Sequence, residues 1–225
     1  METCSVTGRL LARTPGVRCW WQYEPVPERF SYLPGVYEAY RTVPRSDLVS
    51  LAVAPGAPST IPTPGADGPS GGAIEAPIRR VVVTVGTTDR CFRRLVARLA
   101  DILPPDAEVL WQTGHSRVDD LPIEARRLVP EGELVAAVAK ADVVVSHAGA
   151  GSLALALDAG RVPVFVPRRA DAGEQIDDHQ VELARWADQR GLAVMVEADH
   201  IQMADLVRAA ARRVVRNPTE ELILP

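Results

Sequence analysis

The sequence predicts an α/β fold with a doubly wound parallel sheet, and two kinds of segment support this prediction. Short runs of β-branched residues, such as V-V-V-T-V at 81–85, are apolar throughout, which is typical of strands buried on both faces of a sheet. Helical segments lie between them and place apolar residues three and four positions apart, as at 91–103. Because the two kinds alternate from residue 79 onward, the pattern favours a parallel sheet flanked by helices.

Glycine marks the ends of two of the expected helices. Gly160 and Gly191 each follow a helical segment at the place where a C-terminal cap belongs. After the first strand and helix, the expected elements are strands at about 107–112 and near 126–129, a helix at about 132–140, a strand at 142–146, a helix at 152–159, a strand at 162–166, a helix at 177–190, a strand at 192–196 and a last helix from about 201 to 215.

A segment of different composition precedes this domain. Residues 54–78 are rich in Pro, Gly, Ser and Ala, carry almost no charge and show no periodicity. Such a segment cannot bury enough apolar surface to offset the entropy of ordering it, so we expect a flexible linker. We therefore expect an irregular N-terminal fragment at 1–53, which is too short for a core of its own, and a compact domain at 79–225.

Composition and charge argue against several classes of protein. The formal net charge of -4 disfavours nucleic acid as the main partner. The three cysteines have neither metal-ligand spacing nor the pattern of a disulfide framework, so we expect reduced thiols and a cytoplasmic location. No stretch approaches the ~18 apolar residues of a membrane span, and the N-terminus lacks the pattern of a signal peptide.

Polar loops follow three of the expected strands. Gly86, Thr87 and Thr88 follow the strand at 81–85, and H-A-G-A-G-S at 147–152 follows the strand at 142–146. The third loop, at 167–180, follows the strand at 162–166 and reads P-R-R-A-D-A-G-E-Q-I-D-D-H-Q. Because the carboxyl ends of parallel strands meet at one edge of a sheet, we expect the three loops to share a ligand.

The loop at 147–152 has the clearest chemistry. Gly149 and Gly151 let the backbone approach a ligand, and we expect Ser152 to cap the following helix, whose free N–H groups carry partial positive charge. This geometry suits a diphosphate, although the pattern is neither a dinucleotide fingerprint nor a P-loop. A tight turn with a serine cap and a structural role for His147 are the alternative interpretations.

The third loop is unusually polar at the start of the helix expected at 177–190. His179 and Gln180 carry side chains that suit sugar hydroxyls. Asp177 and Asp178 can instead serve as helix caps or as complements to the helix dipole. Since consecutive acidic residues do not have the spacing of metal ligands, we expect no metal ion.

Four motifs, in this order, resemble the C-terminal domain of family 28 glycosyltransferases. They are V-T-V-G-T-T, S-H-A-G-A-G-S, V-P-R and D-D-H-Q-x-E-L-A, and the resemblance covers about residues 79–215. It implies the Rossmann-like half of a two-domain GT-B fold that binds a nucleotide-sugar, usually UDP-linked, without a metal or other cofactor. The residues that would contact this donor are Gly86, Thr87, Thr88, His147, Gly149, Gly151, Ser152, Glu174, Asp178, His179 and Gln180.

The resemblance also implies an activity that this chain would share with another protein domain. It implies an inverting hexosyltransferase of polysaccharide or lipid-linked sugar biosynthesis, with this chain as the donor-binding half. C-S-V-T-G-R-L-L at 4–11 and W-W-Q-Y at 20–23 resemble the end of an acceptor-side domain. The general base would come from a membrane-associated acceptor-domain protein or a missing N-terminal half, so no catalytic residue is named. The chain would be cytoplasmic, with peripheral attachment to the inner face of the membrane left open.

One position departs from the pattern of this family. Relatives often carry a glutamate three residues after the serine, where it can hold the ribose hydroxyls, and this chain has Leu155 there. The departure and the missing acceptor half leave a second hypothesis open, a truncated or non-catalytic module that binds a nucleotide-sugar or a protein partner. An NAD-linked Rossmann enzyme is disfavoured because no G-x-G-x-x-G follows the strand at 81–85.

Overall fold

The computed structural model describes the chain from residue 78 to residue 216 and short parts before it. Contacts divide the chain into two units, Met1–Ala39 with Asn217–Pro225, and Tyr40–Arg216. In the first unit, strands β1 (Trp20–Trp21) and β2 (Ser31–Tyr32) pair in parallel. The segment at 4–11 and nearly all of the expected linker lie outside the described residues. The described residues are 20–21, 31–32, 37, 39–48 and 78–216.

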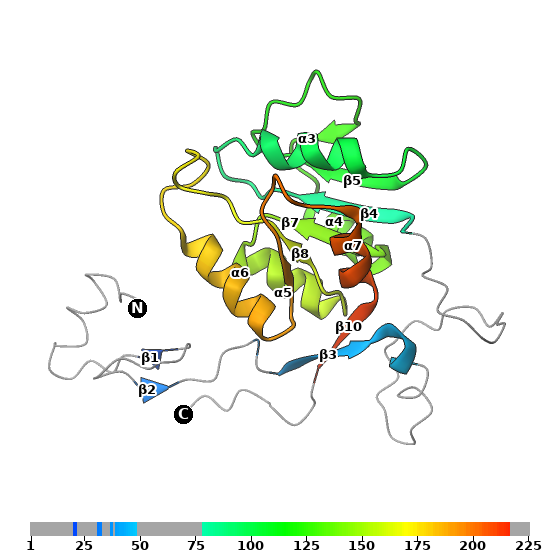
Figure 1. The fold of residues 1–225 in the computed structure, drawn as a ribbon, viewed down its shortest axis with the longest axis vertical. Helices are drawn as coiled ribbons and strands as arrows, with labels where there is room; N and C mark the ends of the chain where they lie inside the picture. The colour runs from blue at the N-terminus through cyan, green and yellow to red at the C-terminus, as the bar shows by residue number, and fades with distance from the viewer. Residues whose placement is uncertain (1–19, 22–30, 33–36, 38, 49–77, 217–225) are drawn as a thin grey trace, which may run out of the picture. The chain divides into compact units, whose positions relative to one another are not determined.

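Six parallel strands form the central sheet of the second unit (Figure 1). Their order is β6-β5-β4-β7-β8-β9, so β4 and β7 lie at the centre. Thr84 of β4 lies opposite Ser146 of β7, and both strands therefore end at the same level. The predicted α/β fold with a parallel sheet is confirmed. The strands are β4 (Arg80–Thr84), β5 (Glu108–Gln112), β6 (Ala125–Arg126), β7 (Val143–Ser146), β8 (Val164–Phe165) and β9 (Val194–Met195).

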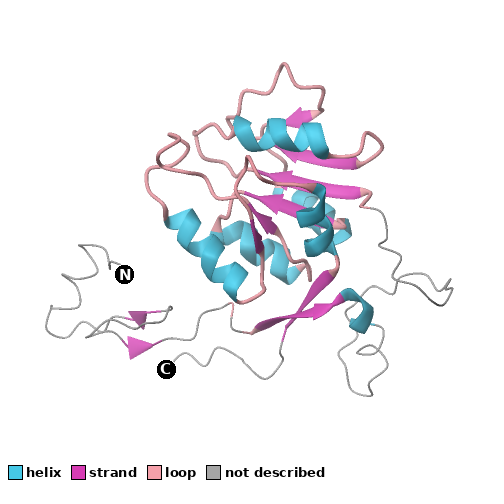
Figure 2. Cartoon of the chain, in the orientation of Figure 1, coloured by secondary structure: helices cyan, strands magenta, loops and turns pink. Residues whose placement is uncertain are grey.

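Helices connect these strands and flank the sheet (Figure 2). Helix α3 leads from β4 outward to β5, whereas α5 leads from β7 outward to β8 in the opposite direction. Because crossovers between parallel strands are right-handed, α3 and α5 lie on opposite faces, and the sheet is doubly wound. The boundary between β4 and β7 is thus a topological switch point, where such folds bind ligands. The helices are α3 (Arg93–Ile102), α4 (Glu131–Lys140), α5 (Ala150–Asp158), α6 (His179–Gln189) and α7 (Met203–Ala210).

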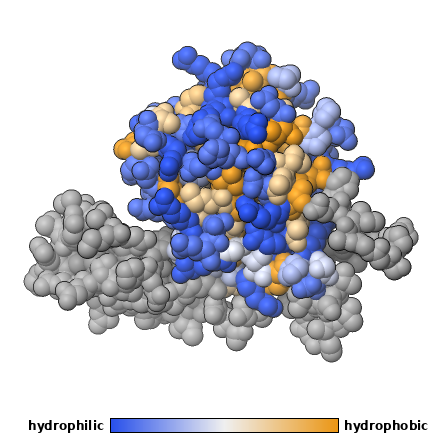
Figure 3. Space-filling model, viewed as in Figure 1, coloured by the Kyte–Doolittle hydropathy of each residue, from blue (hydrophilic) through white to orange (hydrophobic). Residues whose placement is uncertain are grey.

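The core lies around the two central strands, whose residues are almost all buried. Val82 and Val144 pack with Val138 and Ala141, and Leu155 of α5 packs against this cluster. On the face seen in Figure 3, hydrophilic side chains surround smaller apolar areas. The continuous apolar runs of the sequence therefore correspond to the buried strands, as expected for a sheet covered on both faces.

The C-terminal end of the second unit differs from the sequence prediction. The expected last helix at 201–215 ends as α7 at Ala210, and β10 (Arg212–Arg216) follows it. β10 pairs antiparallel with β3 (Tyr40–Pro44), and the short 3-10 helix η1 (Arg45–Asp47) comes next in the chain. The helix prediction was wrong here because the partner of β10 lies far away in the sequence. β3 belongs to the stretch that we expected to be an N-terminal fragment, and it joins the larger unit.

The β3–β10 pair lies at the amino edge of the central sheet. The N–H of Val214 donates to the carbonyl of Gly160, which precedes β8, at 3.1 Å. The Thr42 hydroxyl donates to the carbonyl of Gly191, which precedes β9, at 2.7 Å. Gly160 and Gly191 have φ values of 69° and 70°, which confirms the predicted left-handed positions after α5 and α6. The carboxyl edge of the sheet is therefore free of this pair.

Candidate functional site

The loops that follow β4, β7 and β8 meet at the carboxyl edge of the sheet. The first two loops touch where the ring of His147 lies against Gly86. The first and third are joined by Arg168, whose guanidinium donates to the carbonyl of Val85 at 2.6 Å and to the hydroxyl of Thr88. The structure thus brings together the three loops that the sequence pattern places at one edge.

His147 is a buried residue that fills the space between two glycines. Only 8% of the surface of His147 is exposed. A Cβ added to Gly86 would lie 2.7 Å from Cε1 of the ring, and one added to Gly149 would lie 2.6 Å from Nε2. Both distances are shorter than van der Waals contact, so both positions need glycine to accommodate the imidazole. The structural role of His147 that we considered from the sequence is therefore present in the fold.

The imidazole of His147 is neutral at neutral pH. Burial and the nearby positive charge of Arg168 lower the pKa of His147 from 6.5 to about 4. Nδ1 of the ring lies 3.4 Å from both the carbonyl oxygen of Thr84 and the hydroxyl of Ser146. The ring is therefore held mainly by packing, since both polar contacts are long, and a neutral ring offers a ligand hydrogen bonds instead of a full positive charge.

Helix α5 starts earlier than we expected from the sequence. Its first residue is Ala150 and its N-cap is Gly149, with no hydrogen bond from a capping side chain. Ser152 lies inside the first turn, so the prediction that Ser152 caps the helix was wrong. The chain reaches the helix early because Ala148 adopts a φ of 60°, a conformation that non-glycine residues rarely take.

The first turn of α5 presents an open surface. Apart from its chain neighbours and the backbone of its own helix, no atom of the described residues lies within 4 Å of a Cβ built on Gly151, which is exposed. N–H groups in the first turn of a helix lack acceptors within the helix and carry part of the positive end of the dipole. An anion can therefore approach the backbone at this point.

In the third loop, Glu174 and Gln180 are buried and bonded to the protein. The Glu174 carboxylate accepts from the Arg94 guanidinium at 2.9 and 3.1 Å and from the N–H of Arg169 at 3.1 Å. Oε1 of Gln180 accepts from the N–H of Arg168 at 3.1 Å. Glu174 thus connects the third loop to α3. Because Oε1 of Gln180 already accepts a bond, the amide nitrogen of Gln180 is the atom of this side chain that can donate to a ligand.

The exposed residues at the start of α6 arrange themselves around a short turn. Asp178 is the N-cap by position, but no side-chain cap bond is formed. Its Oδ1 accepts from the N–H of Ala170 at 3.4 Å instead. Asp177 accepts from both the N–H and the ring Nδ1 of His179, which lowers the pKa of Asp177. Asp177 therefore accepts from the first N–H of the helix, as a cap would, and the side chain of His179 is exposed.

Arg168 is the residue of this site that the sequence prediction did not include. It is fully buried, its guanidinium lies 5.5 Å from the centre of the Phe92 ring, and burial lowers its pKa. Thr88 accepts from Arg168 through its hydroxyl, while its carbonyl oxygen lies 2.9 Å from Nδ1 of His115. The arginine of V-P-R was the available signal, but arginine in a loop is usually exposed.

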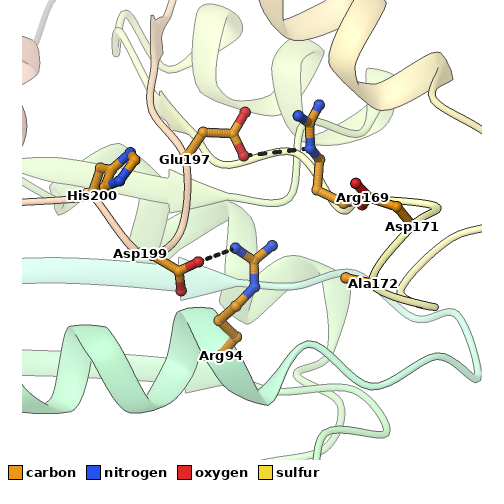
Figure 4. Close-up of a pocket in the computed structure, with 7 residues that line it drawn as sticks. All are labelled: Arg94, Arg169, Asp171, Ala172, Glu197, Asp199 and His200. Atoms are coloured by element: carbon orange, nitrogen blue, oxygen red, sulfur yellow. Dashed lines mark hydrogen bonds and ion pairs between the residues drawn. The ribbon is translucent and has the colours of Figure 1, made fainter.

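A pocket of about 470 Å³ lies beside these loops (Figure 4). Arg94 of α3 pairs with Asp199 at 2.9 Å, and Arg169 of the third loop pairs with Glu197 at 3.6 Å. These four side chains line the pocket together with residues of the same loops. The residues predicted from the sequence to contact a donor are not among those that line it.

Two further properties concern the described residues only. Among them, no group of three or more His, Cys, Asp and Glu side chains is placed to hold a metal ion. No helix in the described part of the chain combines the length and apolar character needed to cross a bilayer.

Comparison with known proteins identifies the family. Residues 80–221 match the glycosyltransferase family 28 C-terminal domain. The chain belongs to this family. The carboxyl-edge loops described above all lie inside the matched region, so the candidate site is part of the family's domain.

Curated relatives of the family are longer than this chain. The UDP-N-acetylglucosamine–N-acetylmuramyl-(pentapeptide) pyrophosphoryl-undecaprenol N-acetylglucosamine transferase of Ralstonia nicotianae is 29% identical over 147 residues, which are 60% of this chain and 39% of that protein. The transferase of the same name from Nitratidesulfovibrio vulgaris is 39% identical over 74 residues, 33% of this chain and 19% of that protein. The match thus spans about two fifths or less of either relative.

Solved structures of glycosyltransferases are also similar to the chain. The calicheamicin glycosyltransferase has a TM-score of 0.49 at 16% identity, covering 84% of this chain and 41% of that chain. SnogD from Streptomyces nogalater has a TM-score of 0.44 at 23% identity, covering 75% and 46%. The kitacinnamycin glycotransferase has a TM-score of 0.45 at 20% identity, covering 67% and 38%.

Proposed function

We propose that this chain is the donor-binding part of an inverting glycosyltransferase of the GT-B type. It binds a nucleotide-sugar, UDP-linked, from which a hexose or N-acetylhexosamine passes to a lipid-linked or polysaccharide acceptor. The observation that carries the proposal is the meeting of three loops at the switch point, around the open first turn of α5. The names of the relatives, which state a UDP-linked donor and a pyrophosphoryl-undecaprenol acceptor, support the same substrate classes.

The diphosphate of the donor binds at the first turn of α5. Backbone N–H groups near Gly151 and Ser152, together with the helix dipole, stabilise the charge that grows on the leaving diphosphate. His147 lies beside this turn, and its ring separates the backbone of Gly86 from that of Gly149. The chain's own contribution to catalysis is this preformed set of donors, which need no reorganisation when the bond to the sugar breaks.

The sugar lies toward α6, where His179 and Gln180 begin the helix. With Oε1 of Gln180 held by the N–H of Arg168, the amide nitrogen of Gln180 donates to a sugar hydroxyl. Exposed His179, whose ring is bound to Asp177, supplies a second polar group. Asp178 and Thr87 lie in the same loops and complete the predicted set.

The acceptor and its general base belong to a partner. An acceptor hydroxyl attacks the anomeric carbon, the bond between that carbon and the diphosphate breaks, and the base takes the hydroxyl proton. We propose that a membrane-associated acceptor-domain protein, or an acceptor half outside the matched region, supplies this base. The chain then works in the cytoplasm or at the inner face of the membrane, where a lipid-linked acceptor is available.

Leu155 favours a second candidate function, a module that binds without transfer. Its side chain packs against the core cluster around Val82 and Val138, so it cannot hold ribose hydroxyls. A site that lacks this contact binds its nucleotide more weakly, unless other groups take the role. Affinity for the nucleotide and transfer activity with an acceptor partner distinguish the two candidates.

Titration calorimetry of the full chain with UDP, UDP-GlcNAc, UDP-Glc and GDP-mannose tests the proposal. We expect binding of UDP and at least one UDP-sugar, and at least ~10-fold weaker binding in Gly151→Leu, whose side chain occupies the approach to the first turn. Gly132→Leu is the matched control, since Gly132 is also the second residue of a helix with open space around it. The proposal is wrong if wild type binds none of the four ligands, or if both variants bind alike.

A further inference from the structure

Arg168 connects three parts of the site. Its guanidinium reaches the loop after β4 by donating to Val85 and Thr88, and its backbone N–H donates to Gln180 of α6. Its side chain also lies over the ring of Phe92. A single residue therefore sets the distance between the first loop and the start of α6.

The positive charge of Arg168 is buried without an anionic partner. The groups that accept its hydrogen bonds are a carbonyl and a hydroxyl, both neutral, and its Nε has no hydrogen-bond partner in the described part of the chain. None of the ion pairs among the described residues includes Arg168. Glu174, the carboxylate whose charge acts on the pKa of Arg168, is itself bonded to Arg94 and to the N–H of Arg169.

A purely structural tie does not need this charge. A buried charge without a counterion is costly, and neutral side chains can fill the space and donate to two acceptors at lower cost. Arginine stays protonated even when buried, so the charge is permanent. A permanent charge beside loops that present backbone N–H groups suits a bound anion, which supplies the missing counterion.

We propose that Arg168 is a positioning residue of the donor site, holding Thr88 and Gln180 in place and supplying a buried positive charge that complements the diphosphate. This inference rests on the proposed function. Because Arg168 is fully buried, it acts through the residues it holds and through its electric field, without touching the ligand. The field reaches the loop at 147–152, since the same charge contributes to the low pKa of His147.

A first experiment needs no ligand. The pKa of His147 is followed by NMR of the imidazole in wild type, Arg168→Met and Arg168→Lys. We expect the pKa of His147 to rise by about one pH unit in Arg168→Met and to stay near the wild-type value in Arg168→Lys. Burial, His179 and the Thr84 carbonyl also act on this pKa, and comparison of Arg168→Met with Arg168→Lys separates their effect from that of the charge. An unchanged pKa in folded Arg168→Met overturns the electrostatic part of the proposal.

A second experiment measures UDP and UMP affinity by calorimetry in the same proteins. We expect Arg168→Met to bind UDP at least ~10-fold more weakly, with a smaller loss for UMP, and Arg168→Lys to recover part of the UDP affinity. Arg169→Met is the matched control, because Arg169 is the adjacent arginine but pairs with Glu197. We expect that control to stay within about twofold of wild type, since its charge is already compensated.

The outcomes separate this inference from the proposed function. If wild type does not bind UDP, the proposed function fails, while the NMR titration still reports on the charge of Arg168. If wild type binds UDP and folded Arg168→Met binds it equally well, the positioning role is wrong. Should Arg168→Met not fold, Arg168→Gln replaces it as the neutral variant: tighter UDP binding by Arg168→Lys than by Arg168→Gln supports the role of charge, and equal UDP affinities of these two variants contradict it.

Discussion

The imidazole of His147 occupies space that any side chain at Gly86 or Gly149 would need. Of the three glycines that the sequence analysis places at the donor, Gly86 and Gly149 therefore have a second reason to be glycine. Of these three glycines, Gly151 alone stands beside open space. At the scale of single residues, His147 packs tightly between Gly86 and Gly149, and the accessible part of the site is the first turn of α5 at Gly151.

This packing predicts a rescue between two substitutions. Gly149 has a φ of -84°, so alanine there strains no backbone, and the cost of Gly149→Ala comes from contact with His147. We expect a loss of about 1–3 kcal/mol in the free energy of unfolding, measured with urea. In a His147→Ala background the same change should cost little. Gly86→Ala is the control, since its φ of 80° keeps it costly in both backgrounds. Equal costs for Gly149→Ala in both backgrounds would contradict this account.

The buried imidazole also predicts how stability depends on pH. The folded chain binds a proton at His147 only near pH 4, whereas the unfolded chain binds it near 6.5. Because the unfolded chain takes up this proton first, the free energy of unfolding falls by about 3 kcal/mol as the pH drops from 6.5 toward 4. Above pH 6.5, the neutral His147 causes no such loss. Urea unfolding between pH 4 and 7.5 should show this slope in wild type but not in His147→Asn. Parallel curves for the two proteins would rule the effect out.

Single residues show where sequence interpretation reaches its limit. The loops that contain Thr88, His147 and Gln180 can be located from the sequence, because each apolar run shows where its strand stops. Ser152 was misplaced because the left-handed turn at Ala148 cannot be seen from residue type. Arg168 was not found because its burial depends on contacts with a loop some eighty residues earlier.

At the scale of elements, length and burial decide what is predictable. The long helices α3, α4 and α6 have periodic apolar residues, and the central strands β4 and β7 have continuous apolar runs. All five lie within a few residues of their expected positions. β8 and β9 consist of two residues each, shorter than the apolar runs that predict them. β10 follows α7 almost without a break, and its strand character depends on pairing with β3.

The pairing of β10 with β3 gives a test that distinguishes a strand from the helix we expected at 201–215. Val214 is buried, and Val215 is partly exposed on the same strand. We expect Val214→Ala to lower the free energy of unfolding by about 1–3 kcal/mol and Val215→Ala to lower it less. In an exposed helix, both changes would stabilise the chain instead, because alanine is the better helix former. Urea denaturation of the two variants distinguishes these outcomes.

At the scale of the whole molecule, the fold class follows from the alternation of buried strands and amphipathic helices, which one sequence is enough to reveal. The division of labour between domains does not follow in the same way, because it depends on residues and partners outside the matched region. The expected boundaries at 53 and 78 therefore stay predictions. What the structure adds is that β3 belongs to the same compact unit as the central sheet.

The proposed division of labour predicts that donor binding and sugar transfer can be separated. The chain alone should bind a UDP-sugar but transfer no sugar to a lipid diphosphate acceptor, because the general base is supplied by a partner. Adding an acceptor-domain protein should start transfer, followed as release of UDP. Gly151→Leu should abolish that release under the same conditions, whereas Gly132→Leu should not. Transfer by the chain alone would contradict the proposed need for a partner.

The location of β3 and η1 has a practical consequence. Both lie near the amino ends of the central strands, as does Arg79, whose carbonyl accepts from Glu108 at the start of β5. Residues 48 and 78, which flank the segment outside the described residues, therefore both lie on the side away from the glycine loops. A fluorophore, affinity handle or surface tether attached at residue 48 or 78 would therefore lie away from the opposite edge, and if the proposed function holds, such a chain could serve as an immobilised sensor of nucleotide-sugars.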